Sequence, residues 1–172
     1  VILDFEDVLR AYLLEWNRRT TPVVCFVTEY EFPECPEPVW EAEESEKAGQ
    51  MEALDEKVLE KIIGIFQNRT IGSVFLVGSG FQEDWAKRSL QYICRGRRVF
   101  KGNNLYSKGA SYGASEKFCL TKEGKEYIFL GKEKLKTNIG LQIVSEGKED
   151  YLPLLDAGME WSEAKCEIEF YL

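Results

Sequence analysis

The spacing of hydrophobic residues predicts alternating helices and strands over the first half of the chain. Residues 5–16 place large apolar side chains three and four positions apart, the spacing of one face of an amphipathic helix. Residues 23–30 are rich in β-branched and aromatic side chains, which favours a strand. Residues 55–67 show the helical spacing again, and residues 73–77 form a continuous apolar run typical of a strand buried on both faces. This alternation predicts an α/β fold.

The rest of the pattern adds two helices and a set of short strands. Residues 83–94 carry an apolar helical stripe, and residues 106–116 form a fourth predicted helix that is rich in small residues. Short predicted strands separated by polar turns follow, at residues 127–130, 139–144, 151–155 and 166–171. We therefore expect an α/β unit over residues 1–123 and a β-rich extension over residues 124–172.

Residues 33–50 differ in composition from their neighbours. Three of the five prolines and a dense set of glutamates fall in this segment. The composition favours a solvated acidic loop. The other interpretation is a partner-binding loop that Trp40 anchors.

Composition and charge narrow the classes of partner. The 172 residues are 44% hydrophobic and 13% aromatic, which is enough for a core and unlike a disordered chain. A net charge of −8 opposes binding to nucleic acid or to an anionic membrane, because both need a basic surface. No apolar run reaches the roughly 20 residues that span a bilayer. Acidic residues follow Val1 at once, unlike a secretory signal, and the missing initiator methionine leads us to expect a fragment of a longer protein.

Cysteine and histidine usage limits the chemistry. The five cysteines are scattered without a CxxC pair, which predicts reduced thiols in the cytoplasm. The chain has no histidine, and this excludes a Ser-His-Asp or Cys-His hydrolase within it. We find no pair of carboxylates that would suit an enzyme of another type.

The first candidate site is the turn formed by Gly78, Ser79 and Gly80. It follows the buried strand at residues 73–77 and precedes a helix. Open α/β sheets bind ligands at the carboxyl ends of their strands, and a helix N-terminus adds N–H groups that suit an anion. Glycine also lets backbone approach a ligand closely. The alternative is a tight turn that needs glycine for its own conformation.

The second candidate feature is the small-residue stripe made by Gly109, Ala110, Gly113 and Ala114. Their spacing of three and four residues places them on one helix face that carries almost no side chain. Another helix could approach this face closely. Taken alone, such a stripe indicates packing.

The two features together resemble a known superfamily. VFLVGSGF at residues 74–81 and SLQYICRGRRVFKGNNLYSKGASYGA at residues 89–114 are similar to an uncharacterised bacterial family of actin-like proteins, within the actin-like and seventy-kilodalton heat-shock-chaperone ATPases. The resemblance covers residues 52–116. It implies an actin-like ATPase lobe of the ribonuclease H-like class, the C-terminal one. A looser likeness at residues 137–155 is to the segment that joins a chaperone's ATPase lobe to its β-sandwich.

The resemblance also implies roles for particular residues. Gly78, Ser79 and Gly80 would contact the adenosine of ATP or ADP, bound with Mg²⁺. The small-residue stripe, with Lys108 before it, would pack at the hinge between two lobes. In the chaperones an arginine stacks on the adenine, and Phe81 and Gln82 hold that place here. Phe81 could stack instead or belong to the core.

Two sets of cations carry both a functional and a structural interpretation. Lys87 could reach the ribose or a phosphate, or lie on a solvated helix face. The cluster of Arg95, Arg97 and Arg98 would interact with the dipole of the preceding helix C-terminus, or bind phosphate or an acidic partner.

The chain departs from the superfamily where phosphate is handled. The two Asp-containing, glycine-rich hairpins that cradle phosphates are not found in the sequence. We therefore expect a partial nucleotide-binding lobe that supplies the adenosine side of an ATP cleft and does not hydrolyse ATP alone, with the missing lobe of its parent as partner. The alternative is a non-enzymatic protein-interaction module that keeps the fold without nucleotide and binds a protein through the acidic segment or the β-rich extension.

Overall fold

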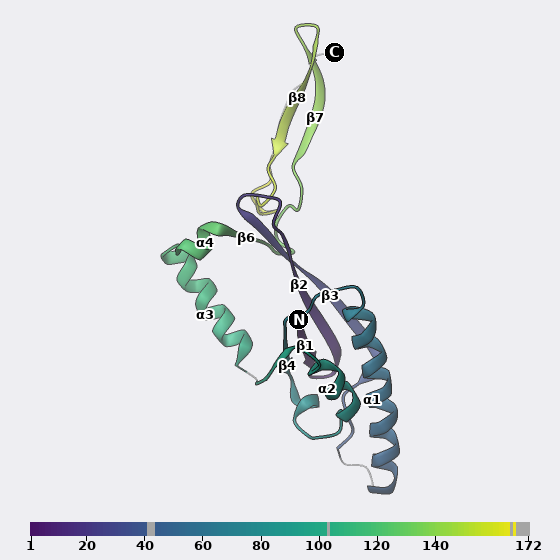
Figure 1. Ribbon diagram of the computed structural model, residues 1–172. Coiled ribbons are helices and arrows are strands. Elements are labelled where there is room, and N and C mark those ends of the chain that lie inside the picture. The colour runs from purple at the N-terminus through teal and green to yellow at the C-terminus, as the bar shows by residue number, and fades with distance from the viewer. Residues whose placement is uncertain (41–43, 103, 166, 168–172) are drawn as a thin grey trace. The chain divides into compact units, whose positions relative to one another are not determined.

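The computed structural model describes residues 1–40, 44–102, 104–165 and 167 (Figure 1). The chain divides into two compact units. Unit 1 comprises Val1–Leu14 and Thr28–Phe118, and unit 2 comprises Glu15–Val27 and Cys119–Leu172. Each unit is described below by itself.

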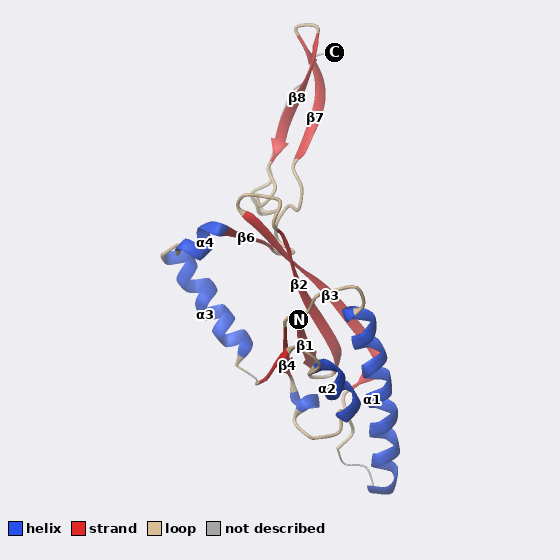
Figure 2. Ribbon diagram, in the orientation of Figure 1, coloured by secondary structure: helices blue, strands red, loops and turns tan. Residues whose placement is uncertain are grey.

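Unit 1 is an α/β unit built on a mixed sheet (Figure 2). The whole sheet has the strand order β5-β4-β1-β2-β3-β6, with β2 antiparallel to β1, and with β4 parallel to both β1 and β5; its last strand, β6, belongs to unit 2. The helices and strands of unit 1 are β1 (Ile2–Phe5), most of β2 (Val8–Asn17), most of β3 (Val23–Pro36), α1 (Glu44–Phe66), β4 (Ser73–Val77), a 3-10 turn (Ser79–Phe81), α2 (Lys87–Ile93), β5 (Arg98–Lys101) and α3 (Leu105–Phe118); the end of β2 and the start of β3 lie in unit 2. The predicted α/β fold class is confirmed.

The core lies between one face of this sheet and helices α1 and α2 (Figure 1). Alternate residues of the strands point to this face, as the two-residue period of a strand requires. Burial of such apolar surface is the main favourable term in folding, roughly 25 cal/mol per Å². The buried core residues are Leu3, Phe5, Leu9, Ala11, Cys35, Val58, Ile62, Ile65, Phe66, Val74, Leu76, Phe81 and Ile93.

The helix predicted over residues 5–16 is wrong, because this segment forms the end of β1 and most of β2. Leu9, Ala11 and Leu13 are buried while the residues between them are only half-buried, which is the alternation of a strand. The apolar positions in this segment fit both periods. The segment is a strand because β1 pairs with both β2 and β4. Such pairing overrides local propensity.

The acidic loop predicted over residues 33–50 is wrong at both ends. β3 continues to Pro36, and α1 already begins at Glu44; residues 41–43 lie outside the described part. Glutamate and lysine are good helix formers, so a polar composition suits the start of α1 as well as it suits a loop. β6 pairs only with Val23–Phe26, so within the described residues the rest of β3 is an edge, where a strand tolerates proline.

The other elements lie close to their predicted positions. The strands expected at residues 23–30, 73–77, 127–130, 139–144 and 151–155 and the helices expected at 55–67 and 106–116 are all present, and the third helix is shortened to α2. The strand expected at residues 166–171 lies almost entirely outside the described residues.

Unit 2 contains the end of β2, the start of β3, a short helix that the sequence did not predict, and three strands that it did. α4 (Lys122–Glu126) leads into β6 (Tyr127–Leu130), which pairs in parallel with the start of β3. β7 (Ile139–Ser145) and β8 (Lys148–Leu155) form a separate antiparallel hairpin. No helix in the described part of either unit is long and apolar enough to cross a membrane.

Candidate functional site

Gly78 lies directly after the carboxyl end of β4, as the sequence predicts. Its φ of 94° is in a region that favours glycine. A Cβ at Gly78 would lie 2.5 Å from the backbone carbon and oxygen of Phe5, and one at Gly80 would lie 2.7 Å from Cγ of Phe5. Both glycines therefore allow the end of β1 to approach the turn.

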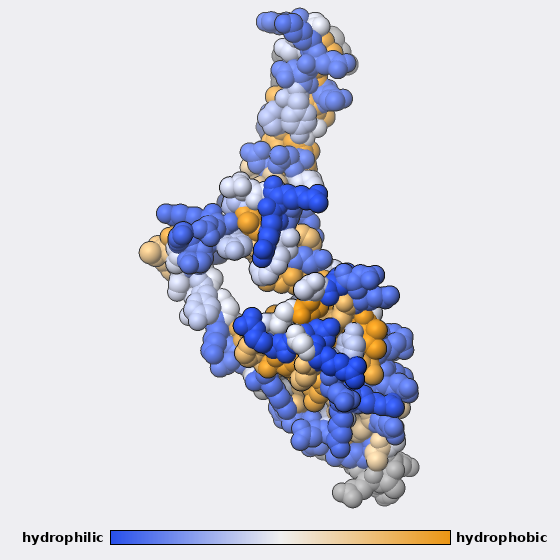
Figure 3. Space-filling model, in the orientation of Figure 1, coloured by the Kyte–Doolittle hydropathy of each residue, from blue (hydrophilic) through white to orange (hydrophobic). Residues whose placement is uncertain are grey.

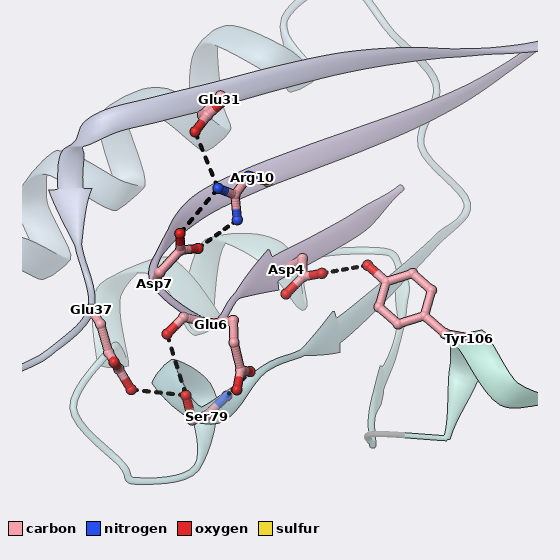
Figure 4. Close-up of polar contacts among 8 residues, drawn as sticks. All are labelled: Asp4, Glu6, Asp7, Arg10, Glu31, Glu37, Ser79 and Tyr106. Carbon is pink, nitrogen blue, oxygen red and sulfur yellow. Dashed lines mark hydrogen bonds and ion pairs between the residues drawn. The ribbon is translucent and has the colours of Figure 1, made fainter. Parts of the chain in front are cut away.

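The polar groups of the turn are bonded to the chain's own carboxylates (Figure 4). The backbone N–H of Ser79 donates to Oε2 of Glu6 at 3.0 Å, and Oγ of Ser79 donates to Oε1 of Glu37 at 2.8 Å. The carbonyl of Gly80 accepts a hydrogen bond from the indole N–H of Trp85 at 2.7 Å. Two acidic side chains thus occupy the side of the turn where an anion would bind, and they would repel a phosphate.

The three candidate residues after the turn have separate positions. Phe81 is 4% exposed and packs edge-on against Phe5 with ring centroids 5.5 Å apart, so it belongs to the core. Gln82 is exposed, and its carbonyl accepts from Nζ of Lys101 at 3.1 Å. Lys87 is exposed at the first position of α2, which agrees with a solvated face.

The N-terminus of α2 is also bound to an internal carboxylate. Asp55 of α1 is 3% exposed and accepts hydrogen bonds from the backbone N–H groups of Arg88 and Ser89 at 2.8 and 3.0 Å and from Oγ of Ser89 at 2.6 Å. Its negative charge complements the positive end of the helix dipole. Sequence reasoning treated Asp55 only as a helix boundary. The signal that could have identified it is its spacing from Met51 and Val58, which puts a carboxylate on a buried face.

The small-residue stripe lies on α3, as predicted, but nothing in the described part of unit 1 packs on it. No residue of α3 is buried, and a Cβ at Gly109 or Gly113 would have no heavy atom within 4 Å. Ala110 and Ala114 are exposed as well. The close helix contact at this stripe therefore stays a prediction that the described residues do not form by themselves.

Tyr106 attaches the first turn of α3 to the sheet. Its hydroxyl donates to Oδ2 of Asp4 on β1 (Figure 4). Burial and the Asp4 carboxylate both raise the pKa of Tyr106, because each disfavours the phenolate. The rest of α3 has no buried residue. Figure 3 shows it as mostly pale, which is the colour of intermediate hydropathy, because small and aromatic residues dominate it.

Arg97 is the member of the arginine cluster that binds the end of α2. The guanidinium of Arg97 donates to the carbonyls of Tyr92 and Arg95 at 3.0 and 3.3 Å. It also lies over the ring of Phe66, 4.7 Å from the ring centroid. For Arg97 this agrees with the interpretation as a cation at the C-terminus of α2.

A surface ion pair holds the loop between β1 and β2. Nη1 of Arg10 lies 2.5 Å from Oδ1 of Asp7, and Nη2 lies 3.2 Å from Oε1 of Glu31 (Figure 4). The hydrogen bond from Arg10, followed by that from the backbone of Val8, lowers the pKa of Asp7 from 3.8 to about 2.

We expect the substitution Arg10→Gln to return the pKa of Asp7 toward 3.8. The carboxylate is stabilised in the folded state, so its contribution to stability is complete above the unfolded pKa and is lost as pH falls through about 2. The variant should lose this pH dependence. A carboxyl-detected NMR titration measures the midpoint, with Arg18→Gln as a control that leaves it unchanged. A wild-type midpoint near 3.8 would contradict the pairing.

Among the described residues no group of three acidic, cysteine or histidine side chains is arranged to hold a metal ion. The cysteines in the described residues, Cys25, Cys35, Cys94 and Cys119, are all free thiols. At the end of β4 the structure brings together a glycine turn and the carboxylates of Glu6 and Glu37 that bind it.

Comparison with known proteins gives a family without an assigned activity. The family described as a family of unknown function (DUF5716), C-terminal, matches residues 2–132. A domain of unknown function (DUF8552) matches residues 134–172. No curated protein and no solved structure matches the chain. Since the first match covers most of the sequence, the chain belongs to the DUF5716 C-terminal family.

Proposed function

We propose that this chain is an actin-like, ribonuclease H-like lobe that acts as a non-enzymatic protein-interaction module, with α3 as its contact helix. The sheet supports the fold part of this proposal: an antiparallel β1–β2 pair lies beside the parallel strands β4 and β5, and helices connect the later strands. That arrangement is compatible with the lobe that the sequence resemblance implies.

The observation that carries the proposal is the exposure of α3. The helix has 14 residues, none of them buried. Gly109 and Gly113 lie in its interior, where each costs roughly 1 kcal/mol relative to alanine. An isolated helix of about this length is marginal in water even with a favourable sequence. α3 therefore needs a packing partner, and the described residues of unit 1 do not supply one.

The stripe on α3 suits a helix of a partner protein. Tyr106, the four small residues and Lys117 follow one another at helical spacing and so share one side. Small residues lower the separation at which two helices can pack, so a partner helix with a projecting apolar ridge would fit between the two longer side chains. Lys117 at one end favours a partner helix with an acidic residue at the matching position.

The nucleotide interpretation has less support from the same unit. The groups expected to receive adenosine or phosphate are engaged by Glu6, Glu37 and Asp55. The glycines are required by the approach of Phe5. We place the proposed module in the cytoplasm, where free thiols such as Cys94 and Cys119 persist.

Site-specific photo-crosslinking in cells tests this proposal. A photo-reactive amino acid at Ala110, on the stripe, should crosslink the full-length protein to one partner species. The same group at Lys108, on the opposite side of α3, should not, and Gly113→Leu in the Ala110 protein should reduce the product at least about tenfold because the stripe is then filled.

Equal crosslinking from both sides, or none from Ala110, would overturn the proposal. A thermal-shift titration with Mg²⁺ and ATP provides the second arm. Stabilisation of the full-length protein that Lys87→Ala abolishes would favour the adenosine cleft over the interaction module.

A further inference from the structure

Helices α1 and α2 cover one face of the unit 1 sheet, and the opposite face, which we call the second face, carries apolar side chains of its own. Strands that pair in parallel, as β1, β4 and β5 do, usually have both faces covered by crossover helices. Side chains alternate between the faces along a strand, so the neighbours of core residues point to the second face. The apolar residues there, which lie outside the described core cluster, are Ile2, Tyr12, Leu14, Phe75 and Phe100.

The strand register aligns four of these residues into one row. Ile2 pairs with Tyr12 of β2 on one side and with Phe75 of β4 on the other. Phe75 in turn pairs with Phe100 of β5, and their rings are stacked with centroids 5.0 Å apart. Phe100 is 47% exposed, and Leu14, two residues beyond Tyr12, is 42% exposed. A contiguous apolar surface that is exposed to this degree indicates a contact surface.

The first turn of α3 is attached to this second face. Asp4 lies between the buried Leu3 and Phe5, so its side chain points away from the core. The hydroxyl of Tyr106 donates to the Asp4 carboxylate (Figure 4). After burial and Asp4, the nearby Tyr12 also raises the pKa of Tyr106. Tyr106 shares one side of α3 with the small-residue stripe, so the stripe lies on the side of the helix that is attached to the sheet.

The path of the chain independently places α3 over the second face. α2 connects β4 to its parallel neighbour β5 and packs on the core face. From β5 the chain returns in the opposite direction through the strand order to β6, which is parallel to β3. The connection at residues 18–22 is too short for a parallel pair, so β3 is antiparallel to β2 and β6 is parallel to β5. Crossovers between parallel strands are right-handed in about 98% of cases, so the reversed direction requires the opposite face.

We propose that α3 closes onto the second face, with its small-residue stripe against the exposed apolar side chains, and that this closure excludes a partner from the stripe. In the arrangement described, a Cβ at Gly109 or Gly113 would have no heavy atom within 4 Å, so α3 is open. Tyr106 is the pivot, because it already contacts the sheet. A stripe without large side chains lets the backbone of α3 lie close to the aromatic rings of the sheet.

The dimensions of the two surfaces predict which residues meet in the closed state. To lead from the end of β5 back toward the start of β6, α3 runs in the direction of β2. Leu14 lies four residues beyond Arg10, the residue that pairs with Asp4, which is roughly 13 Å along β2. Ala114 lies eight residues beyond Tyr106, which is roughly 12 Å along α3. Ala114 therefore lies against Leu14 when α3 is closed.

Closure itself does not depend on the proposed function, since both surfaces belong to unit 1 of this chain. Its regulatory consequence rests on the proposed function. The same stripe serves the sheet in the closed state and the partner in the open state, so closure is autoinhibitory.

Disulfide trapping in the full chain tests closure. Leu14→Cys with Ala114→Cys should form an intrachain disulfide on oxidation at least about tenfold faster than Leu14→Cys with Ser115→Cys, because the bond needs Cα atoms within about 7 Å. Ser115 is the matched control, since it follows Ala114 directly and lies on the side of α3 opposite Tyr106. The background carries serine in place of three other thiols, at Cys94, Cys119 and Cys166.

Hydrogen exchange tests the same closure without added cysteines. Phe100→Asp places a charge in the apolar row, and it should speed exchange of the α3 amides at least about fivefold while the core strands keep their protection. Val39→Asp is the control, because Val39 is an exposed apolar residue beside α1, away from the second face. Equal disulfide rates from Ala114 and Ser115, a disulfide that forms only between two copies, or α3 exchange that Phe100→Asp leaves unchanged would overturn closure.

The regulatory part has a separate readout. The purified Leu14→Cys and Ala114→Cys protein, with a photo-reactive amino acid at Ala110, is mixed with non-reducing cell extract. The oxidised form should give at least about tenfold less of the partner product than the reduced form. Equal yields would overturn autoinhibition. No product from either form would overturn the proposed function and autoinhibition together, while the disulfide rates would still decide closure.

Discussion

Gly78→Val is expected to lower the free energy of unfolding of unit 1 by at least about 3 kcal/mol. Two effects add at this position. The backbone φ of 94° with ψ of 161° is a conformation that side chains other than glycine rarely adopt. The new Cβ would also lie 2.5 Å from the backbone of Phe5, in the strand at the centre of the core. Urea denaturation followed by circular dichroism measures the loss.

Gly72→Ala is the matched control for this substitution. Gly72 precedes the same strand, has no positive φ, and leaves open space where its Cβ would stand. Its replacement should change stability by no more than about 0.5 kcal/mol. Equal losses of unfolding free energy in the two variants, or a Gly78→Val protein as stable as wild type, would show that the turn does not contact β1 closely. Because this variant tests folding, nucleotide binding is better tested at the exposed Lys87.

Gly78 shows which features the sequence could predict and which it could not. The strand at residues 73–77 and the glycine turn after it are local features, and both lie where the pattern places them. The residue that makes glycine necessary is Phe5, which is 73 positions away in the chain. A glycine that is required by contact with a ligand looks the same in a sequence as one that is required by contact with backbone. Only the fold distinguishes them.

The errors at residues 5–16 and 33–50 have a similar cause. In the first segment apolar residues fit both the helical and the strand period, and the antiparallel pairing of β1 with β2 decides between them. In the second, composition alone does not separate an exposed helix from a loop, since both are polar. α3 was placed correctly because its small residues lie at helical spacing. Whether anything packs on α3 depends also on the surface that would contact it, and the spacing within α3 carries no information about that surface.

Asp55→Ala is expected to destabilise unit 1 by about 3–5 kcal/mol. The substitution removes a buried carboxylate that accepts from two backbone N–H groups of α2 and from the Ser89 hydroxyl. Ser89 is fully buried, so water cannot readily replace the lost acceptor. Hydrogen bonds to a charged group contribute more than neutral ones, and buried donors left without an acceptor add their desolvation cost. Hydrogen exchange should show the first turn of α2 losing protection before the strands of the core.

Comparison with two neighbouring substitutions separates this effect from a general loss of charge. Glu56→Ala removes an acidic side chain that is 76% exposed and 3.9 Å from Arg88, so it should change stability by no more than about 0.5 kcal/mol. Ser89→Ala removes one of the three donors and should cost about 1 kcal/mol. Combined with Asp55→Ala, it should add less than it costs alone, since its hydroxyl has already lost the Asp55 carboxylate. Strict additivity in this double-mutant cycle, measured by urea denaturation, would mean that Asp55 does not act through α2. A coupled result would establish that the Asp55 carboxylate helps to hold α1 and α2 together. The same carboxylate occupies a helix N-terminus that could otherwise receive an anion.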